Sequence, residues 1–458
     1  RDLLAKGDFR AVELAQSYLE NIKKSDHDIK AYLEVFDDVL SQAEEADRKI
    51  ANKEGGFLTG IPIAIKDNIL IKGKKCSAAS KMLADYVAPY DATVTEKLKN
   101  AGAVFLGRTN MDEFAMGGST ENSAFGPTKN PRDISRVPGG SSGGSAAATA
   151  SDQTLASLGS DTGGSVRQPA SFCGVVGLKP TYGSVSRYGL IAMGSSLDQI
   201  GPITKSVTDA ETLFNVIKGK DIMDSASIET VEENSFNRKI GIPAGFMDAE
   251  GIDEKVLINF NESIERFKSI GYEVLNIEMP NVKYSLAVYY IIMPAEVSSN
   301  LARFDGVKYG LHISGKNSIE DYFMTRGSGF GKEARRRILL GTYVLSSGYY
   351  DAYYNKANQV RNLIRNDYKE AFKNVSLIIT PTAPTPAWKI GEKLNNPLEM
   401  YLADIFTTPA NITGIPAISL PSGFKKVGDK SLPLGIQLMS DYGREDALFK
   451  AGKDFLGE

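Results

Sequence analysis

Three residues of this chain have the types and sequence surroundings that serine-based hydrolysis requires: Lys66, Ser141 and Ser165. A serine hydroxyl is a poor nucleophile until a base removes its proton. Histidine is the usual base, but this sequence has only His27 and His312, both in ordinary polar surroundings. Lysine is the remaining common base, so Lys66 is the candidate for that role.

Lys66 ends a short, continuous apolar run that begins at Gly60, a pattern typical of a strand buried on both faces. Lysine accepts a proton at neutral pH only if its pKa falls from about 10.4 to about 7, which costs roughly 4.6 kcal/mol. Burial at the end of such a strand can supply this change. The alternative is a lysine paired with Asp67 or another carboxylate, and for this motif alone that arrangement is the more common one.

In a second motif, Gly163 and Gly164 directly precede Ser165. Glycines allow consecutive backbone N–H groups to turn inward. A row of such donors, from Thr162 to Ser165, would stabilise the oxyanion of a tetrahedral intermediate. A plain turn after a strand at 154–159 explains these glycines equally well.

The third motif, Gly139–Ser145, allows three interpretations. It fails as a phosphate-binding loop, because serine stands where that loop needs lysine. It formally fits a nucleophile elbow, but two prolines disfavour the strand that must precede an elbow, and His312 is the only downstream histidine. In the third interpretation, Ser141 relays a proton between Ser165 and Lys66.

The composition excludes several classes of protein. A net charge of −3 argues against a broad nucleic-acid-binding surface, and no apolar run reaches the ~18 residues that span a bilayer. The first residues lack the apolar core of a secretory signal, so we expect a cytoplasmic protein, and the missing initiator Met indicates a trimmed chain. The two cysteines, Cys76 and Cys173, give neither a disulfide framework nor zinc-ligand spacing, and Cys173 is more typical of a buried side chain than of a nucleophile.

Strand-like and helix-like segments alternate along the sequence, which predicts an α/β fold with a central mixed β-sheet covered by helices on both faces. We expect helices at 9–24, 37–53, 93–101 and 253–269 and strands at 60–66, 103–107, 239–242, 272–277, 376–380, 417–420 and 434–438. Asp8 is placed to cap the first helix. Because no repeat or linker interrupts the pattern, we expect one large domain over 1–458, with catalytic loops within 60–190 and a mostly helical region at 282–374.

Together, the loops that hold Lys66, Ser141 and Ser165 resemble the amidase signature family, whose hallmark is a Ser–Ser–Lys triad. The spacing of the three residues also matches that family. The resemblance implies that Lys66 is the base, Ser141 the bridging serine behind a cis peptide bond, and Ser165 the nucleophile. The implied oxyanion hole consists of the amides of Thr162, Gly163, Gly164 and Ser165.

Within that family, four further segments resemble the glutaminase subunits of the tRNA-dependent amidotransferases: Met111–Asn122, Asn300–Gly306, Gly331–Arg337 and Leu345–Asp351. The resemblance covers essentially the whole chain. It implies that glutamine is hydrolysed and that ammonia passes to a partner B subunit. There, with ATP and Mg²⁺, ammonia amidates Glu-tRNA(Gln) or Asp-tRNA(Asn), and a small C subunit braces the pair. The tRNA is then held mainly by B, and we expect no metal or nucleotide site in this chain.

Free glutamine is a zwitterion, so its pocket needs a cation for the α-carboxylate and an anion for the α-ammonium. By resemblance, Arg337 binds the carboxylate, Asp404 binds the ammonium and Tyr289 donates a hydroxyl beside them. Each has an ordinary alternative, since Arg337 is one of three consecutive arginines and either Tyr289 or Tyr290 could belong to the core.

Two other functions stay open at this point. A stand-alone amidase of small or aryl amides would use the same triad, and only the ion-pair pocket distinguishes it from a glutaminase. An inactive scaffold would need no triad, and the intact Lys66, Ser141 and Ser165 argue against it.

Overall fold

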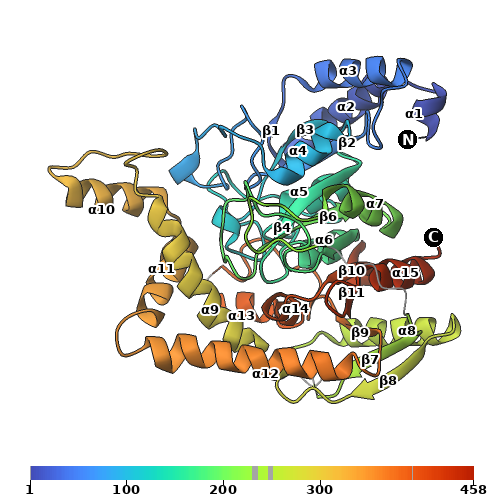
Figure 1. Ribbon diagram of the computed structural model, residues 1–458, viewed down its shortest axis with the longest axis vertical. Helices are drawn as coiled ribbons and strands as arrows, with labels where there is room; N and C mark the ends of the chain where they lie inside the picture. Colours follow the sequence, from blue (N-terminus) through green and yellow to red (C-terminus); the bar gives the residue numbers. More distant parts are fainter. Residues whose placement is uncertain (1, 230–235, 246–250, 395) are drawn as a thin grey trace.

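One mixed sheet runs through the part of the chain that the computed structural model describes, residues 2–229, 236–245, 251–394 and 396–458. Its eleven strands lie in the order β1-β3-β2-β4-β6-β5-β10-β11-β9-β7-β8. Helices flank the sheet, which confirms the predicted α/β class (Figure 1).

Strands and helices alternate over most of the chain. The strands are β1 (Tyr32–Val35), β2 (Pro62–Lys66), β3 (Val104–Thr109), β4 (Ala156–Asp161), β5 (Val176–Lys179), β6 (Gln199–Thr204), β7 (Lys239–Pro243), β8 (Glu273–Ile277), β9 (Leu377–Pro381), β10 (Ala417–Val427) and β11 (Lys430–Ser440). The α-helices are α1 (Asp2–Lys6), α2 (Ala11–Ile29), α3 (Val39–Ala51), α4 (Thr93–Asn100), α5 (Gly143–Ala150), α6 (Arg167–Cys173), α7 (Val207–Ile217), α8 (Glu254–Ser269), α9 (Ser285–Asn300), α10 (Ser318–Gly329), α11 (Lys332–Val344), α12 (Lys356–Ala371), α13 (Pro397–Leu402), α14 (Thr408–Thr413) and α15 (Glu445–Leu456).

Strands β2 and β4 are parallel neighbours, so their carboxyl ends meet at the same end of the sheet. Every residue of β2 is buried, as its continuous apolar run predicts. Lys66 is the last residue of β2, and β4 ends at Asp161, just before the loop that holds Ser165. The parallel pairing therefore places the lysine beside that loop.

A separate apolar core lies under helices α9, α11, α12 and α14. Helix α11 packs closely on α9, because Gly341 lies against the carbonyl of Pro294, where a Cβ would overlap the carbonyl oxygen. This contact fixes α11, which carries Arg337, against α9, which carries Tyr289. In Figure 1 residues 304–355, which include α10 and α11, extend away from the sheet as an arm.

The structure corrects several predicted elements. Asp8 does not cap a helix: α2 begins at Ala11, and the Glu13 carboxylate accepts from the Arg10 amide at 2.8 Å. Strands β5 and β6 were not predicted, because glycine and, in β6, Pro202 interrupt their apolar runs. Both strands of the β10–β11 hairpin extend well beyond their predicted segments. In β10 only the predicted part, Ala417–Leu420, is buried, whereas β11 is buried from Leu432 to Ser440.

Candidate active site

Lys66 is completely buried and surrounded by oxygen atoms. Its Nζ donates to Ser141 Oγ at 2.8 Å, to Ser142 Oγ at 2.8 Å, to Ser160 Oγ at 2.9 Å and to the Ser160 carbonyl at 3.2 Å. A neutral amine has two protons and one lone pair, so one of these hydroxyls must donate to it when the charge is lost. The arrangement therefore permits proton exchange between Lys66 and Ser141.

Burial lowers the pKa of Lys66 to about 7, although nearby carboxylates favour its charged form. This is the value that a base working at neutral pH requires. Asp67, the alternative partner, instead accepts from Arg108 Nη1 at 2.8 Å. Lys66 is therefore held among hydroxyls and not in an ion pair with its sequence neighbour.

Ser141 is positioned by the backbone of a tightly enclosed glycine. The peptide bond between Gly140 and Ser141 is cis, as the family resemblance implies. The Gly140 amide donates to Gln168 Oε1 at 2.9 Å, and a Cβ at Gly140 would overlap the Asp112 carboxylate. The Asp112 amide in turn donates to the Ser141 carbonyl at 3.2 Å. Contacts from both sides thus fix Ser141 beside Lys66.

Ser165 lies next to this pair and retains some exposure, 8%. Its carbonyl accepts from the Ser142 amide at 3.1 Å, which joins the two serine loops. Among the described residues, the Ser165 hydroxyl makes no hydrogen bond, so the Ser165–Ser141 half of the predicted relay is not formed in this structure. Catalytic hydrogen bonds are often long without substrate and tighten when it binds.

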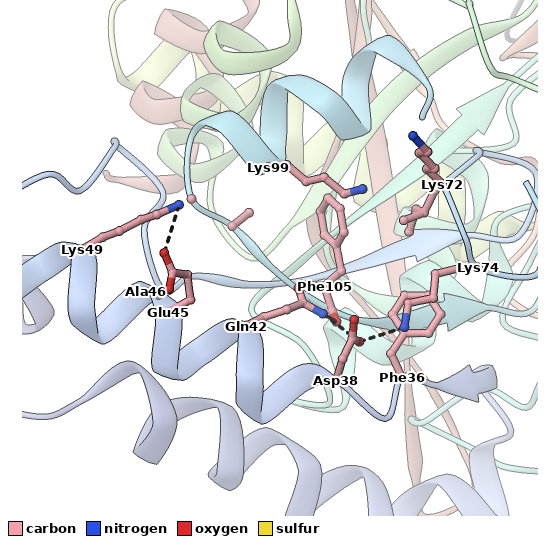
Figure 2. A pocket seen from close by; sticks show the side chains of 13 residues that line it. Phe36, Asp38, Gln42, Glu45, Ala46, Lys49, Lys72, Lys74, Lys99 and Phe105 are labelled. Atoms are coloured by element: carbon pink, nitrogen blue, oxygen red, sulfur yellow. Dashed lines mark hydrogen bonds and ion pairs between the residues drawn. The ribbon is translucent and has the colours of Figure 1, made fainter. Parts of the chain in front are cut away.

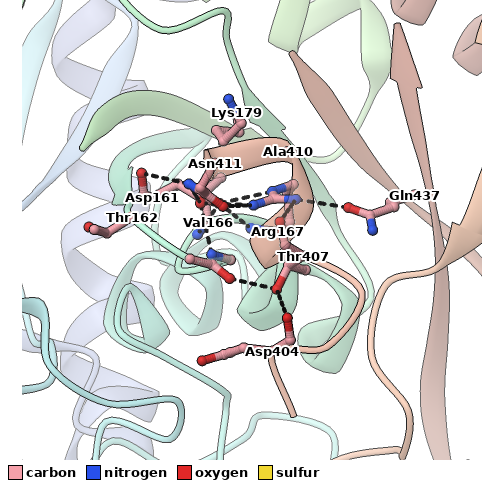
Figure 3. Close-up of polar contacts among 12 residues, drawn as sticks. Asp161, Thr162, Val166, Arg167, Lys179, Asp404, Thr407, Ala410, Asn411 and Gln437 are labelled. Carbon is pink, nitrogen blue, oxygen red and sulfur yellow. Dashed lines mark hydrogen bonds and ion pairs between the residues drawn. The ribbon is translucent and has the colours of Figure 1, made fainter. Parts of the chain in front are cut away.

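A fully buried ion pair shapes the loop that follows β4 (Figure 3). Arg167 and Asp161, both with side chains 0% exposed, pair at 3.0 Å. Arg167 also donates to the Thr407 carbonyl, and Thr407 Oγ1 donates to the Gly163 carbonyl at 2.6 Å. Because every member has a partner, the network fixes the path of the loop from Asp161 to Ser165.

The same network changes the composition of the oxyanion hole. The amide of Gly164, expected to be one of its donors, points to Asp161 Oδ1 at 2.8 Å. Within the described residues, the amides of Thr162, Gly163 and Ser165 have no hydrogen-bond partner. Three amides of this loop, not four, therefore remain as candidate donors.

Arg337 is buried on α11, with 4% of its side chain exposed, and only part of its guanidinium group is paired. Its Nε donates to Glu333 Oε1 at 2.8 Å, and its Nη1 contacts Met293 Sδ at 3.5 Å. Burial disfavours its charge, but Glu333 outweighs this effect and raises the pKa of Arg337 above the usual range. Among the described residues its Nη2 makes no hydrogen bond, so the outer edge of the group can receive a carboxylate.

Asp404 lies close to this cation, and its Oδ2 accepts from the Tyr290 hydroxyl at 3.0 Å. Burial raises the pKa of Asp404 to about 7, against the opposing influence of Tyr290 and Arg337. Tyr289, the predicted hydroxyl donor, is buried with its ring and hydroxyl against Gly163 and does not bond Asp404. The donor to Asp404 is therefore the neighbouring tyrosine, while Tyr289 lies between the pocket and the oxyanion loop.

Two stacked tyrosines connect the acidic residues of the pocket. The rings of Tyr290 and Tyr401 lie 4.1 Å apart, and the Arg337 guanidinium lies over both, at 5.8 and 5.6 Å from their centroids. Tyr401 donates to Glu333 Oε1 at 2.9 Å, as Tyr290 does to Asp404. The two stacked tyrosines thus connect Glu333, the ion-pair partner of Arg337, with Asp404, the candidate ligand of the ammonium group.

The sequence reasoning missed five residues of this region: Asp161, Arg167, Ser142, Ser160 and Glu333. Ser142 lies within the Gly139–Ser145 motif and Ser160 shortly before Thr162, but a single sequence does not tell which of several neighbouring serines faces Lys66. Glu333 lies one helical turn before Arg337, a spacing that permits an i,i+4 ion pair and could have indicated it.

A cavity of about 250 Å³ between α3 and β3 lies outside this site (Figure 2). Its lysines are largely paired: Lys74 with Asp38 at 2.9 Å and Lys49 with Glu45 at 3.9 Å. No candidate catalytic residue lines it. In the described ranges no group of three or more His, Cys, Asp or Glu side chains could hold a metal ion, and no described helix is long and apolar enough to cross a membrane.

Comparisons with known proteins agree with this geometry. The sequence model of the Amidase family matches residues 13–449. The chain is 54% identical to the A subunit of glutamyl-tRNA(Gln) amidotransferase from Thermodesulfovibrio yellowstonii, over 95% of this chain and 91% of that protein. It is 53% identical to the protein of the same name from Thermoanaerobacter pseudethanolicus, over 99% and 94%.

Solved structures give the same result. The crystal structure of the glutamyl-tRNA(Gln) amidotransferase A subunit from Thermotoga maritima matches with a TM-score of 0.78 and 45% identity, over 97% of this chain and 90% of that one. A structure described as a vestigial protein complex that reveals the origins of an s-triazine catabolic enzyme matches with a TM-score of 0.86 and 29% identity, over 100% and 97%. Because its sequence and its fold both match over nearly the whole length, this chain belongs to the amidase family.

Proposed function

We propose that this chain is the glutaminase subunit of a glutamyl-tRNA(Gln) amidotransferase. The observation that carries the proposal is the arrangement near the nucleophile loop, where the partly paired cation of Arg337 and the side chain of Asp404 lie close enough to interact electrostatically. Such a pair matches the α-carboxylate and α-ammonium of an amino acid. Relatives more than 50% identical over nearly their full length are named as subunits of that enzyme.

In the first half of the reaction, Lys66 takes the proton of Ser165 through Ser141, and Ser165 Oγ bonds to the side-chain amide carbon of glutamine. The amides of Thr162, Gly163 and Ser165 stabilise the resulting oxyanion. The carbon–nitrogen bond then breaks, and the nitrogen leaves as ammonia with a proton returned along the same relay. Water hydrolyses the remaining γ-glutamyl ester, which releases glutamate and restores Ser165.

The rest of the assembly follows from the same proposal. A partner B subunit receives the ammonia, holds the mischarged tRNA and uses ATP and Mg²⁺, and a C subunit braces this chain against B. The tRNA is Glu-tRNA(Gln) or Asp-tRNA(Asn), and the complex works in the cytoplasm. The net charge of −3 on this chain is consistent with tRNA being held elsewhere.

A stand-alone amidase of small amides is not favoured. It would use the same triad, but a neutral substrate needs no buried pair of opposite charges beside the nucleophile, and an unmatched buried charge is costly. The relatives named as amidotransferase subunits, which match nearly the whole chain, also favour the glutaminase.

The test is glutamate release from glutamine by the purified chain, alone and with its B and C subunits, ATP and mischarged tRNA. We expect release that increases with the complete set and that disappears in Ser165→Ala. Hydrolysis of a neutral amide without any glutamine hydrolysis, under every combination, would contradict the proposal.

A further inference from the structure

The arm, residues 304–355, has the chemistry of a protein-binding surface. Its helices α10 and α11 place large apolar side chains in solvent: Ile319 is 67% exposed, Phe323 71% and Leu339 70%. On α10 the exposed residues Tyr322 and Phe323 follow Ile319 by three and four positions, so the helix turns this apolar face outward. In a monomer that face would pack on the core.

The arm is held in place from its inner side. Arg326 Nη1 donates to the carbonyls of Leu301 at 2.8 Å and Phe304 at 2.9 Å. Thr325 is fully buried, and Gly329 lies against Met82, where a Cβ would overlap the methionine side chain. These contacts on the inner side of α10 hold the helix in place, so its apolar outer face has a fixed position.

The outer surface continues at the end of α11. Three exposed tyrosines form one cluster there: the ring of Tyr343 lies 4.4 Å from that of Tyr349 and 6.2 Å from that of Tyr353. Tyrosine gives a large contact area at a low cost in conformational entropy and is enriched in protein interfaces. Each of the three rings is at least 40% exposed.

The charge of the arm indicates the chemistry of its occupant. Residues 304–355 contain seven Lys or Arg and five Asp or Glu, a net charge of +2, whereas the whole chain carries −3. A partner that covers the arm therefore needs an apolar centre and an acidic rim. Nucleic acid also offers acidic groups, and its bases can stack on aromatic rings, but it offers no aliphatic surface to match Ile319 and Leu339.

We infer that the arm is the docking surface for a protein partner with an acidic rim, namely another subunit of the proposed amidotransferase. The inference rests on the proposed function, because the assembly is what supplies that subunit. Docking on the arm would also affect the glutamine site, because helix α11 carries the buried Arg337 on one side and the exposed Leu339 on the other. A partner on the arm thus touches the helix that positions the substrate.

The test compares Phe323→Glu and Leu339→Glu with the parent chain and with Phe424→Glu, a matched change of a 65% exposed residue on β10, away from the arm (Figure 1). Association with the purified B and C subunits is measured by titration calorimetry. Hydrolysis of glutamine by the isolated chain checks that each variant is folded. We expect both arm variants to associate on the order of 30-fold more weakly than the parent, the effect of losing an interface hot spot, while Phe424→Glu associates normally.

Association of both arm variants at the parent's affinity overturns the inference. The inference is also overturned if the parent chain dimerises through the arm and the variants are monomeric but still bind B and C. It is overturned as well if the variants weaken binding of tRNA but not binding of the subunits. The inference also fails if the parent chain hydrolyses glutamine but binds neither B nor C. A parent chain that binds through the arm without hydrolysing glutamine would support docking and contradict the proposed function.

Discussion

The catalytic loops and the glutamine pocket are built in opposite ways. The loops come from neighbouring strand ends and bury Lys66 completely, with three hydroxyls and one carbonyl, all uncharged groups, as its hydrogen-bond partners. The pocket comes from α9, α11 and the segment after α13, and it holds charged groups in partial pairs, Arg337 with Glu333 and Asp404 with Tyr290.

The difference separates two tasks. Burial lowers the pKa of Lys66 to about 7, against the influence of nearby carboxylates, and makes it a base for any amide. A partly paired surrounding keeps Arg337 charged with donors free, so that it binds only a substrate with a carboxylate. Chemistry and substrate choice should therefore fail independently when each region is changed.

Changes in the catalytic loops should produce the largest effect. Ser165→Ala removes the nucleophile and Lys66→Met removes the base, and each should reduce kcat about 10⁴-fold or more for glutamine and for a neutral amide alike. Steady-state assays on both substrates measure this. Retained hydrolysis of the neutral amide in either variant would show that the two regions do not divide the work in this way.

The pH dependence should distinguish the two substrates. Lys66 must be neutral to act as a base and Asp404 ionised to bind an ammonium group, and the pKa of each lies at about 7. Activity is therefore lost as pH falls. Well below pH 7, kcat/KM should decrease about tenfold per pH unit for a neutral amide and approach 100-fold per unit for glutamine. Equal slopes of kcat/KM against pH for both substrates would contradict the role of Asp404 in binding the ammonium group.

Glu333 should act on substrate binding through Arg337. Glu333→Ala leaves a buried guanidinium without its partner and should raise KM for glutamine about 10- to 100-fold with little change in kcat, and Glu333→Gln should recover part of this loss. The matched control on the same helix is the exposed Arg335→Met, which should stay within about twofold of the parent. A decrease confined to kcat would contradict this role.

Substitution of Lys179 should have the smallest effect, and it serves as the control for substitution of Lys66. It is equally buried, and burial lowers its pKa to about 7 as well, but in the described structure its Nζ donates only to the Pro180 carbonyl, at 2.8 Å. Lys179→Met should leave glutamine hydrolysis within about threefold and the free energy of unfolding unchanged or ~1 kcal/mol higher, as measured by urea unfolding. A large loss of kcat would mean that the hydrogen-bond partners of the two lysines do not separate a structural lysine from a catalytic one.

The catalytic loops could be predicted because their signal is local. Gly140 and Gly163 stand where backbone approaches other groups too closely for a Cβ, and such positions leave glycine-rich motifs in the sequence. The apolar run before Lys66 likewise identified a buried strand. The class of fold followed from the same alternation of strands and helices.

The pocket could be predicted only in part, because its contacts join residues far apart in the chain. Whether Tyr289 or Tyr290 reaches Asp404 depends on how α9 is rotated about its axis, and that rotation is set by packing against α11. The Gly164 amide depends in the same way on Asp161, whose orientation is fixed by Arg167. Neither contact can be predicted from the residues that neighbour it in the sequence.

Substitution of Arg337 tests the central claim most directly. Kinetics of Arg337→Met should be measured on glutamine and on a neutral primary amide under identical conditions. The account predicts that kcat/KM for glutamine falls about 100-fold or more, whereas hydrolysis of the neutral amide stays within about threefold of the parent. An equal loss on both substrates, or none on glutamine, would contradict the division between a general amide-cleaving centre and a pocket that selects glutamine.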